Sequence, residues 1–174
     1  MKRETIEKIF NFLNTKEGRK IPKKWADTLA KYEEKKELIR VLENHPDGAQ
    51  YKYYDSIYLM NTNIKKLPND LYVTGNLYLN DCKQLTKLPD KLYVNGSLYL
   101  SGCQQLTELP NNLYVEYSLD LNETNIEKLP NNLYVGRNLY IYNTPILNKY
   151  TDEEIYEIVA SKGGTIKARI IRYF

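Results

Sequence analysis

The chain has 174 residues, a net charge of +3 and 42% hydrophobic residues, values that are ordinary for one soluble domain. No apolar run approaches the roughly 18 residues that a membrane-spanning helix needs, so the sequence argues against that class. The first ten residues, MKRETIEKIF, lack the continuous apolar stretch of a secretory signal, and the two cysteines suit a reducing compartment. We therefore expect a protein of the cytoplasm, or of the host cytoplasm if a phage encodes it.

Residues 1–50 are expected to form a helical N-terminal cap. Apolar residues recur with helical spacing from Ile6 to Leu13 and again from Trp25 to Leu42, and the run from Asn44 to Gly48 is dense in helix breakers. A small basic cluster lies between the two apolar stretches and consists of Lys16, Arg19, Lys20, Lys23 and Lys24. We interpret this cluster as part of a solvated linker, and a contact with nucleic acid is the alternative.

Residues 51–147 contain about four and a half copies of one unit of 20 or 21 residues. The unit reads x-L-Y-L-x-x-(T/C)-x-(x)-(I/L)-x-x-L-P-x-x-L-Y-V-x-x. A repeat of this length indicates a solenoid, in which each coil buries its apolar edge against its neighbours. Such a molecule offers a surface for holding a partner, which lowers the expectation of an enzyme.

Within one unit the alternation of residue types separates the inside of the coil from the outside. In L-Y-L, Leu77 and Leu79 are two residues apart and point inward from a strand, while Tyr78 points outward. Stacked copies then form a parallel sheet. Proline keeps the Leu-Pro segment extended and outside a sheet interior, and L-Y-V is expected to form a second extended piece on the opposite side of the coil. A small residue follows L-Y-L at the turn, where it can bond to backbone: Thr62, Cys82, Cys103, Thr124 and Thr144.

These residues resemble the leucine-rich repeat family, in particular its short L-P-containing class of bacterial and phage proteins. The resemblance covers more than half of the chain. It implies an α/β solenoid, a right-handed coil with the L-Y-L strands in a parallel sheet on the concave face, and a protein-binding role. Some members carry a C-terminal ubiquitin-ligase domain, but only 27 residues follow these repeats and none is a cysteine, so ligase activity is not expected.

Residues 148–174 are expected to form a C-terminal cap made of a helix and a strand. Thr151 and Glu154 have the spacing of a capping box, and Gly163-Gly164 ends the helix. The alternation that begins at Thr165 predicts one half-buried strand, with Ile166, Ala168 and Ile170 on the inner face. This strand could pair in parallel with residues 139–141 and close the sheet.

The outward residues of the L-Y-L strands form the candidate binding face. Tyrosine outnumbers the other aromatic residues, 17 against three Phe and one Trp, and many tyrosines recur at fixed repeat positions among Ser and Asn. Rigid aromatic side chains among adaptable hydrogen-bonding ones are typical of protein-binding surfaces. The predicted contact residues are Tyr58, Tyr78, Tyr99, Asp120, Tyr140, Tyr142, Tyr117, Asn80 and Asn122.

A structural interpretation of these tyrosines remains open, because rings in register on parallel strands can stabilise a sheet by themselves. The equally regular column of Tyr72, Tyr93, Tyr114 and Tyr134 favours caution. Asp120 interrupts the first column and Tyr117 replaces a glycine of two earlier copies, so the region around them is the predicted centre of specificity. Drift within a repeat is the alternative explanation for both departures.

No pattern in the sequence indicates catalysis, a metal or a cofactor. His45 is the only histidine, and Cys82 and Cys103 lie 21 residues apart in neighbouring coils, where we expect free buried thiols. We expect a non-enzymatic protein-binding module. The chain is rich in residues with AT-rich codons, which favours a bacterial or phage source. A stand-alone solenoid of this size resembles inhibitors made by phages or mobile elements, and this resemblance implies an inhibitor of a host defence protein. The alternatives are a nucleic-acid-binding protein that uses tyrosine stacking and a structural assembly subunit.

Overall fold

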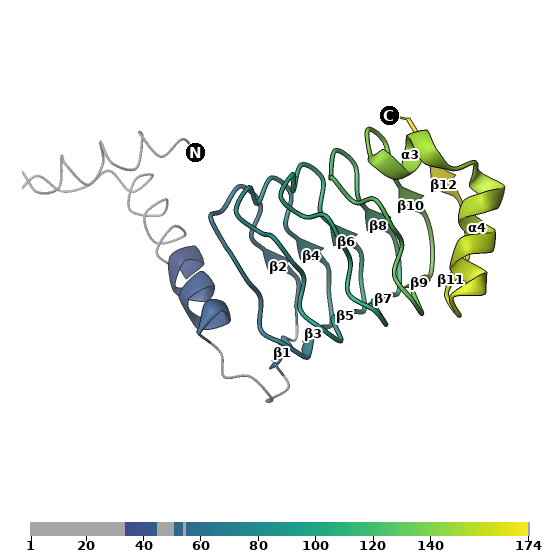
Figure 1. Cartoon of the computed structure of the whole chain (residues 1–174). Helices are drawn as coiled ribbons and strands as arrows, with labels where there is room; N and C mark the ends of the chain where they lie inside the picture. The colour runs from purple at the N-terminus through teal and green to yellow at the C-terminus, as the bar shows by residue number, and fades with distance from the viewer. Residues whose placement is uncertain (1–33, 45–50, 54, 174) are drawn as a thin grey trace, which may run out of the picture. The chain divides into compact units, whose positions relative to one another are not determined.

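The computed structural model describes residues 34–44, 51–53 and 55–173, with side chains from residue 55 onward in the coils (Figure 1). The chain divides into two compact units, Met1–Arg40 and Val41–Phe174. A helix covers residues 34–43. The rest of the predicted N-terminal helical region, with its basic cluster and His45, lies outside the described residues.

Residues 51–173 form a parallel β-solenoid of about four turns, in which successive coils add strands to two sheets (Figure 1). The first sheet, sheet A, carries the L-Y-V segments and comprises β1 (Tyr51–Tyr53), β3 (Leu71–Val73), β5 (Tyr93–Val94), β7 (Tyr114–Val115), β9 (Tyr134–Val135) and β11 (Thr165–Ile166). Sheet B carries the L-Y-L segments and comprises β2 (Ile57–Tyr58), β4 (Leu77–Tyr78), β6 (Leu98–Tyr99), β8 (Leu119–Asp120), β10 (Leu139–Tyr140) and β12 (Ile170–Ile171).

The predicted alternation of inward and outward residues is confirmed in both sheets. The leucines of L-Y-L and the Leu and Val of L-Y-V are buried, whereas the tyrosines between them are half-buried or exposed. Strands pair copy to copy without a shift, so that Leu98 lies between Leu77 and Leu119. Equivalent residues of successive copies therefore form straight columns across each sheet.

The two strands of one coil form neighbouring sides of it, which corrects the expectation that L-Y-V lies opposite L-Y-L. Only residues 74–76 separate β3 from β4, whereas residues 59–70 separate β2 from β3. The longer stretch, which includes Leu67-Pro68, connects the end of β2 to the start of β3 and contains no strand. The inward alternation of the two strands is interrupted at this corner, where the position of Gly75 is taken in later copies by the exposed Tyr117 and Arg137.

The coils contain no helix in the described residues between 51 and 144, so the helical part of the expected α/β solenoid is small. Each coil instead turns at two positions with positive φ. They are Asn61, Asp81, Gly102, Glu123 and Asn143 after sheet B, and Asp70, Lys91, Asn112, Asn132 and Gly163 after the proline position. Asn, Asp and Gly adopt this conformation most readily. Glu123 and Lys91 are the exceptions, at a cost of about 1–2 kcal/mol each.

The small residue after each L-Y-L is confirmed as a backbone partner, and it is buried in every copy except the first, where Thr62 is half-buried. Thr124 Oγ1 donates to the carbonyl of Leu121 in its own coil at 2.7 Å. Cys103 Sγ donates instead to the carbonyl of Leu79 in the preceding coil at 3.0 Å. The copies with one extra residue at this turn therefore use a sulfur that reaches the neighbouring coil, which helps to keep 20- and 21-residue copies in register.

The C-terminal region begins with helices α3 (Pro145–Lys149) and α4 (Asp152–Ser161). The capping box is confirmed, since the N–H of Thr151 donates to Glu154 Oε2 at 2.7 Å and the N–H of Glu154 to Thr151 Oγ1 at 3.2 Å. Arg172 follows the last strand and ties it to these helices, donating to Asp152 and to the carbonyls of Leu147 and Tyr150.

The single strand expected after Thr165 is in fact two strands. β11 joins sheet A beside β9 and β12 joins sheet B beside β10, so this segment forms one further coil. Ile166 and Ile170 are buried as predicted, but Ala168 is exposed because it lies at the corner between the strands. None of the helices in the described parts of the chain is long and apolar enough to cross a membrane.

Candidate protein-binding face

The outward positions of sheet B form one column in register: Tyr58, Tyr78, Tyr99, Asp120 and Tyr140. The rings of Tyr58 and Tyr78 stack with centroids 4.8 Å apart, and those of Tyr78 and Tyr99 stack at 4.7 Å with planes 2° apart. Parallel strands at about 4.8 Å spacing impose this distance. The structure therefore brings together five of the predicted site residues in a single row.

Hydrogen bonds to the phenol groups fix the direction of the rings. The side-chain amide of Asn76 donates to the hydroxyl of Tyr78 at 3.1 Å, and that of Asn138 donates to the hydroxyl of Tyr140 at 3.3 Å. In each pair the amide lies two residues before the tyrosine on the same face of the strand. Tyr140 is thus held as Tyr78 is, although its neighbour in the column is an aspartate.

Asp120 occupies a ring position with a much shorter side chain. Its Oδ1 accepts the backbone N–H of Asn122 at 3.0 Å. Burial raises the pKa of Asp120 above its ordinary value, the bond from Asn122 lowers it, and the negative charge of Glu123 raises it further. Among the described residues Asp120 has no ion-pair partner, so an acid that prefers solvent or a cation is held between two tyrosines.

Replacing Asp120 by asparagine is expected to stabilise the protein at pH 7, because asparagine can still accept the N–H of Asn122 without a buried charge. The raised pKa means that the folded wild type binds more protons than the unfolded chain just above the ordinary value of 3.8. Wild-type stability therefore falls as pH rises through this window. Urea unfolding at about pH 7 and about pH 3.5 should show the advantage of Asp120→Asn shrinking in acid, and an advantage that grows in acid would contradict this cause.

The remaining predicted residues of the face have different roles. Asn122 is only 7% exposed, and its Oδ1 accepts the N–H of Tyr142 at 2.7 Å, so its side chain supports the neighbouring coil. Tyr142 is 38% exposed, and Asn80 is half-buried beside the outward column. Tyr142 and Asn80 are therefore accessible to a partner, while the buried Asn122 holds the backbone of Tyr142.

Tyr117 lies at the corner between the two sheets, where it is 42% exposed. The guanidinium of Arg137 lies over its ring, 4.7 Å from the centroid, as a cation–π pair. Arg137 is not among the contact residues predicted from the sequence. The signal was present, since Gly75, Gly96, Tyr117 and Arg137 occupy one position of successive copies, and only the last two carry side chains.

The outward column of sheet A is a longer and unbroken stack. Its rings, Tyr72, Tyr93, Tyr114 and Tyr134, lie 4.6, 4.2 and 4.5 Å apart. The hydroxyl of Tyr114 donates to Glu116, and Lys167 Nζ lies over the ring of Tyr134 at 5.0 Å. All four rings are half-buried. The ring faces in this column contact one another, as they do in an aromatic ladder that stabilises a sheet.

The cysteines in the described part of the chain form no disulfide. The thiols of Cys82 and Cys103 are both fully buried. The hydrogen bond with Cys82, together with burial, raises the pKa of the Cys103 thiol, which suppresses the reactive thiolate. The described residues contain no group of three or more His, Cys, Asp or Glu side chains that could hold a metal ion.

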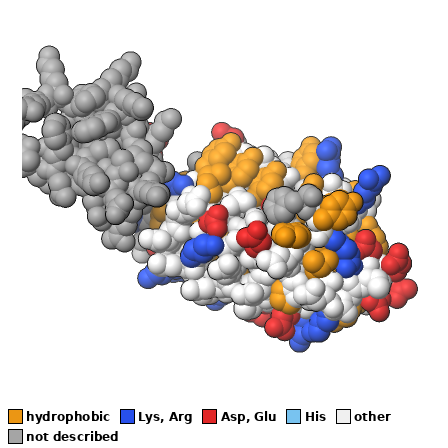
Figure 2. All heavy atoms as spheres, turned by 90° about the horizontal axis from the view of Figure 1, so that it is seen from above, with side chains coloured by type: hydrophobic (Ala, Val, Ile, Leu, Met, Phe, Trp, Pro, Cys, Tyr) orange, Lys and Arg blue, Asp and Glu red, His pale blue; other side chains and the backbone are white. Residues whose placement is uncertain are grey.

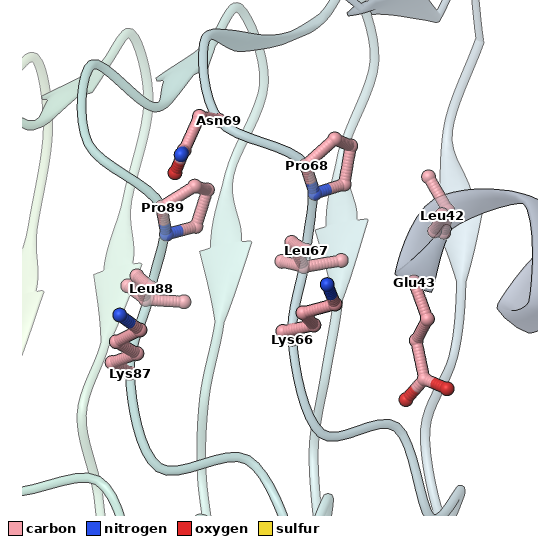
Figure 3. Close-up of a pocket in the computed structure, with 9 residues that line it drawn as sticks. All are labelled: Leu42, Glu43, Lys66, Leu67, Pro68, Asn69, Lys87, Leu88 and Pro89. Carbon is pink, nitrogen blue, oxygen red and sulfur yellow. The ribbon is translucent and has the colours of Figure 1, made fainter. Parts of the chain in front are cut away.

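A shallow cavity of about 210 Å³ lies away from the tyrosine columns (Figure 3). Leu42 and Glu43 border it on one side, and the Leu67-Pro68 and Leu88-Pro89 segments line the rest, with Lys66 and Lys87 beside them. Glu43 Oε1 accepts the N–H of Lys65 at 2.7 Å, which fixes this border. No residue predicted for binding lines the cavity.

The surface seen in Figure 2 shows hydrophobic side chains, with tyrosine counted among them, gathered in short rows, and acidic and basic side chains scattered between.

Comparisons of the chain with protein-family models, with curated proteins and with solved structures found no match. The resemblance to leucine-rich repeats therefore stays a prediction, while the repeating parallel coil is a structural finding.

Proposed function

We propose that this chain is a non-enzymatic module that binds a partner protein through the outward face of sheet B. The observation that carries the proposal is the column of tyrosines in register, which runs from an exposed Tyr58 to a half-buried Tyr140 and is broken once by an acid. Tyrosine is enriched where protein interfaces gain most of their affinity. The column thus concentrates that residue type on one side of the coil.

The fixed geometry of the rings supports the same proposal. A side chain that is already held in place loses less conformational entropy when it binds, so more of the contact energy appears as affinity. The stacks at 4.7–4.8 Å and the bonds from Asn76 and Asn138 hold the rings in this way. The face therefore has the rigid aromatic anchors of a preorganised binding surface.

We propose that the module acts in a cytoplasm by occluding its partner, as an inhibitor encoded by a phage or a low-GC bacterium would. The abundance of Lys, Asn, Ile and Tyr supports such a source. The described residues offer no reactive centre, and occlusion needs none. A component of a host defence system is the class of partner that fits an inhibitor of this origin.

The arrangement of the rings disfavours the nucleic-acid alternative. Bases bind tyrosines by stacking on their flat faces. Those faces cover one another from Tyr58 to Tyr99 in sheet B and throughout the sheet A column, so an interior ring such as Tyr78 or Tyr93 offers a base only its edge. A complex with nucleic acid would also weaken steeply as salt rises, which separates the two functions experimentally.

Affinity capture with matched variants tests the proposal. The triple variant Tyr78→Ala, Tyr99→Ala, Tyr140→Ala should lose the partner that the wild type recovers from host lysate. The variant Tyr72→Ala, Tyr93→Ala, Tyr134→Ala, which shortens the other column, should retain it if both variants are folded by circular dichroism. Equal recovery by wild type and the sheet B variant would refute the proposed face, and the solution mass of the purified chain would reveal a self-assembling subunit instead.

A further inference from the structure

The interruption of the sheet B column has a specific geometry. Asp120 pairs in register with Tyr99 on one side and Tyr140 on the other. Two strand spacings separate these rings, or about 9.5 Å. Elsewhere in the column a third ring fills that interval and stacks on both neighbours, as Tyr78 does between Tyr58 and Tyr99. Asp120 contributes a carboxylate at this position of the column, where its neighbours contribute a ring.

The two rings that border the interval are held by contacts with the column or with the same strand. Tyr99 lies 2° from the plane of Tyr78. Tyr140 has the same hydrogen bond from the asparagine two residues before it as Tyr78 has, so its ring is directed in the same way. We refer to Tyr99, Asp120 and Tyr140 as the Tyr–Asp–Tyr cluster.

The carboxylate of the cluster is available for pairing. One oxygen of Asp120 accepts the N–H of Asn122, and the described residues provide no cation for the other. No buried side-chain oxygen in the described part of the chain lacks a partner, so the second oxygen of Asp120 is open to solvent. Glu123, also near the cluster, adds a second negative charge. The guanidinium of Arg137 lies over the ring of Tyr117.

We propose that the Tyr–Asp–Tyr cluster binds the side chain of one arginine presented by the partner protein. A guanidinium is flat and stacks on aromatic rings. At the level of Asp120 it would lie about 4.8 Å from each ring, within the roughly 6 Å range of a cation–π contact. Its forked N–H groups match a carboxylate, and burial between rings strengthens that pairing. A lysine ammonium is compact and cannot fill the interval as a planar group does.

This inference rests on the proposed binding face and names the chemistry that the face recognises. It also explains the interruption itself, because a fifth tyrosine would complete the column at the cost of the carboxylate. The variant Asp120→Tyr should therefore separate stability from recognition. It adds two stacked pairs, which should raise the melting temperature by about 3–8 °C, and it should abolish arginine binding.

The test is a titration by NMR of the full chain with Nα-acetyl-arginine methylamide, with the matching lysine and citrulline compounds as controls. Citrulline keeps the shape of arginine without its charge. We expect saturable shifts of the Tyr99 and Tyr140 ring signals with the arginine compound, at a Kd in the millimolar range, about −4 kcal/mol at 1 mM. Asp120→Asn should weaken binding by about tenfold or more, while Tyr134→Leu, in the other sheet, should leave it unchanged.

Equal binding of the citrulline compound, tighter binding of the lysine compound, or unchanged arginine binding by Asp120→Asn would overturn the inference. Asp120→Asn keeps the bond to Asn122, so it serves even if Asp120→Tyr does not fold. The captured partner distinguishes this inference from the proposed function. If the triple tyrosine variant loses the partner while Asp120→Asn binds it at full affinity, the result would support the binding face and refute the arginine site.

Discussion

Leu98→Ala is expected to lower the free energy of unfolding by about 3–5 kcal/mol, the largest effect of any substitution considered for this chain. Leu98 is fully buried and lies in β6 between Leu77 and Leu119. The N–H of Leu98 and the N–H of Leu77 each bond to the next coil at 2.9 Å. Because these bonds fix the distance between coils, the strands cannot collapse into the space that the leucine leaves.

Gln105→Ala in the same coil is the control for Leu98→Ala. Gln105 is exposed, and its replacement should change stability by no more than about 0.5 kcal/mol. Urea unfolding followed by circular dichroism measures both variants. A loss below about 1 kcal/mol for Leu98→Ala would show that the inward leucines do not form the continuous core described for the coils.

Tyr114→Ala is expected to cost about 2–3 kcal/mol although the residue lies on the surface. Its ring stacks on Tyr93 at 4.2 Å and on Tyr134 at 4.5 Å, and its hydroxyl donates to Glu116. Each stacked pair contributes about 0.5–1.5 kcal/mol beyond the burial of its area. Removal of the ring breaks both pairs and divides the sheet A column in two.

Tyr173→Ala provides the comparison, because Tyr173 is 76% exposed near the end of the last coil. Its loss should leave the unfolding midpoint nearly unchanged. Recovery of a partner should be the same for Tyr114→Ala as for the wild type, since sheet A has a structural role. If Tyr114→Ala were no more destabilising than Tyr173→Ala, the ladder would have no stabilising function and its regularity would need another explanation.

Much of the coil could be predicted because the position of a residue in the repeat indicates whether its side chain faces the core or the solvent. The burial of Leu77, Leu79, Leu71 and Val73 follows from their spacing of two, and the backbone bonds of Thr124 and its equivalents follow from a small polar residue at a turn. Thr151 and Glu154 identified the start of α4 by the spacing of a capping box. In each case a local rule applied without any knowledge of distant contacts.

The errors in the prediction arose where the path of the chain depends on geometry beyond the local pattern. Spacing could not show that β3 and β4 meet at a corner, because Val73 and Leu77 would alternate in the same way on opposite walls. Ala168 kept the period of a strand and yet lies at the equivalent corner of the last coil. A period of two describes which side a residue faces, but not where the sheet bends.

The sequence predicted which residues form the column of the candidate site, but not the hydrogen bonds that hold their side chains. The sequence identified Tyr99, Asp120 and Tyr140 as one column, and only the structure shows the register that places Asp120 between the two tyrosines and the bond from Asn138 that holds Tyr140. Asn122 has the residue type of a contact residue, yet its bond to the backbone of Tyr142 requires it to be buried. Hydrogen bonds between coils are invisible in a single repeat.

The most direct test of the binding face is to compare the reactivity of individual tyrosine rings in the free chain and in its complex with the captured partner. Limited iodination followed by mass spectrometry reports each ring separately. The account predicts slower labelling of Tyr58, Tyr78, Tyr99 and Tyr140 in the complex and unchanged labelling of Tyr72, Tyr93, Tyr114 and Tyr134. Protection of the sheet A rings alone, or of neither column, would contradict it.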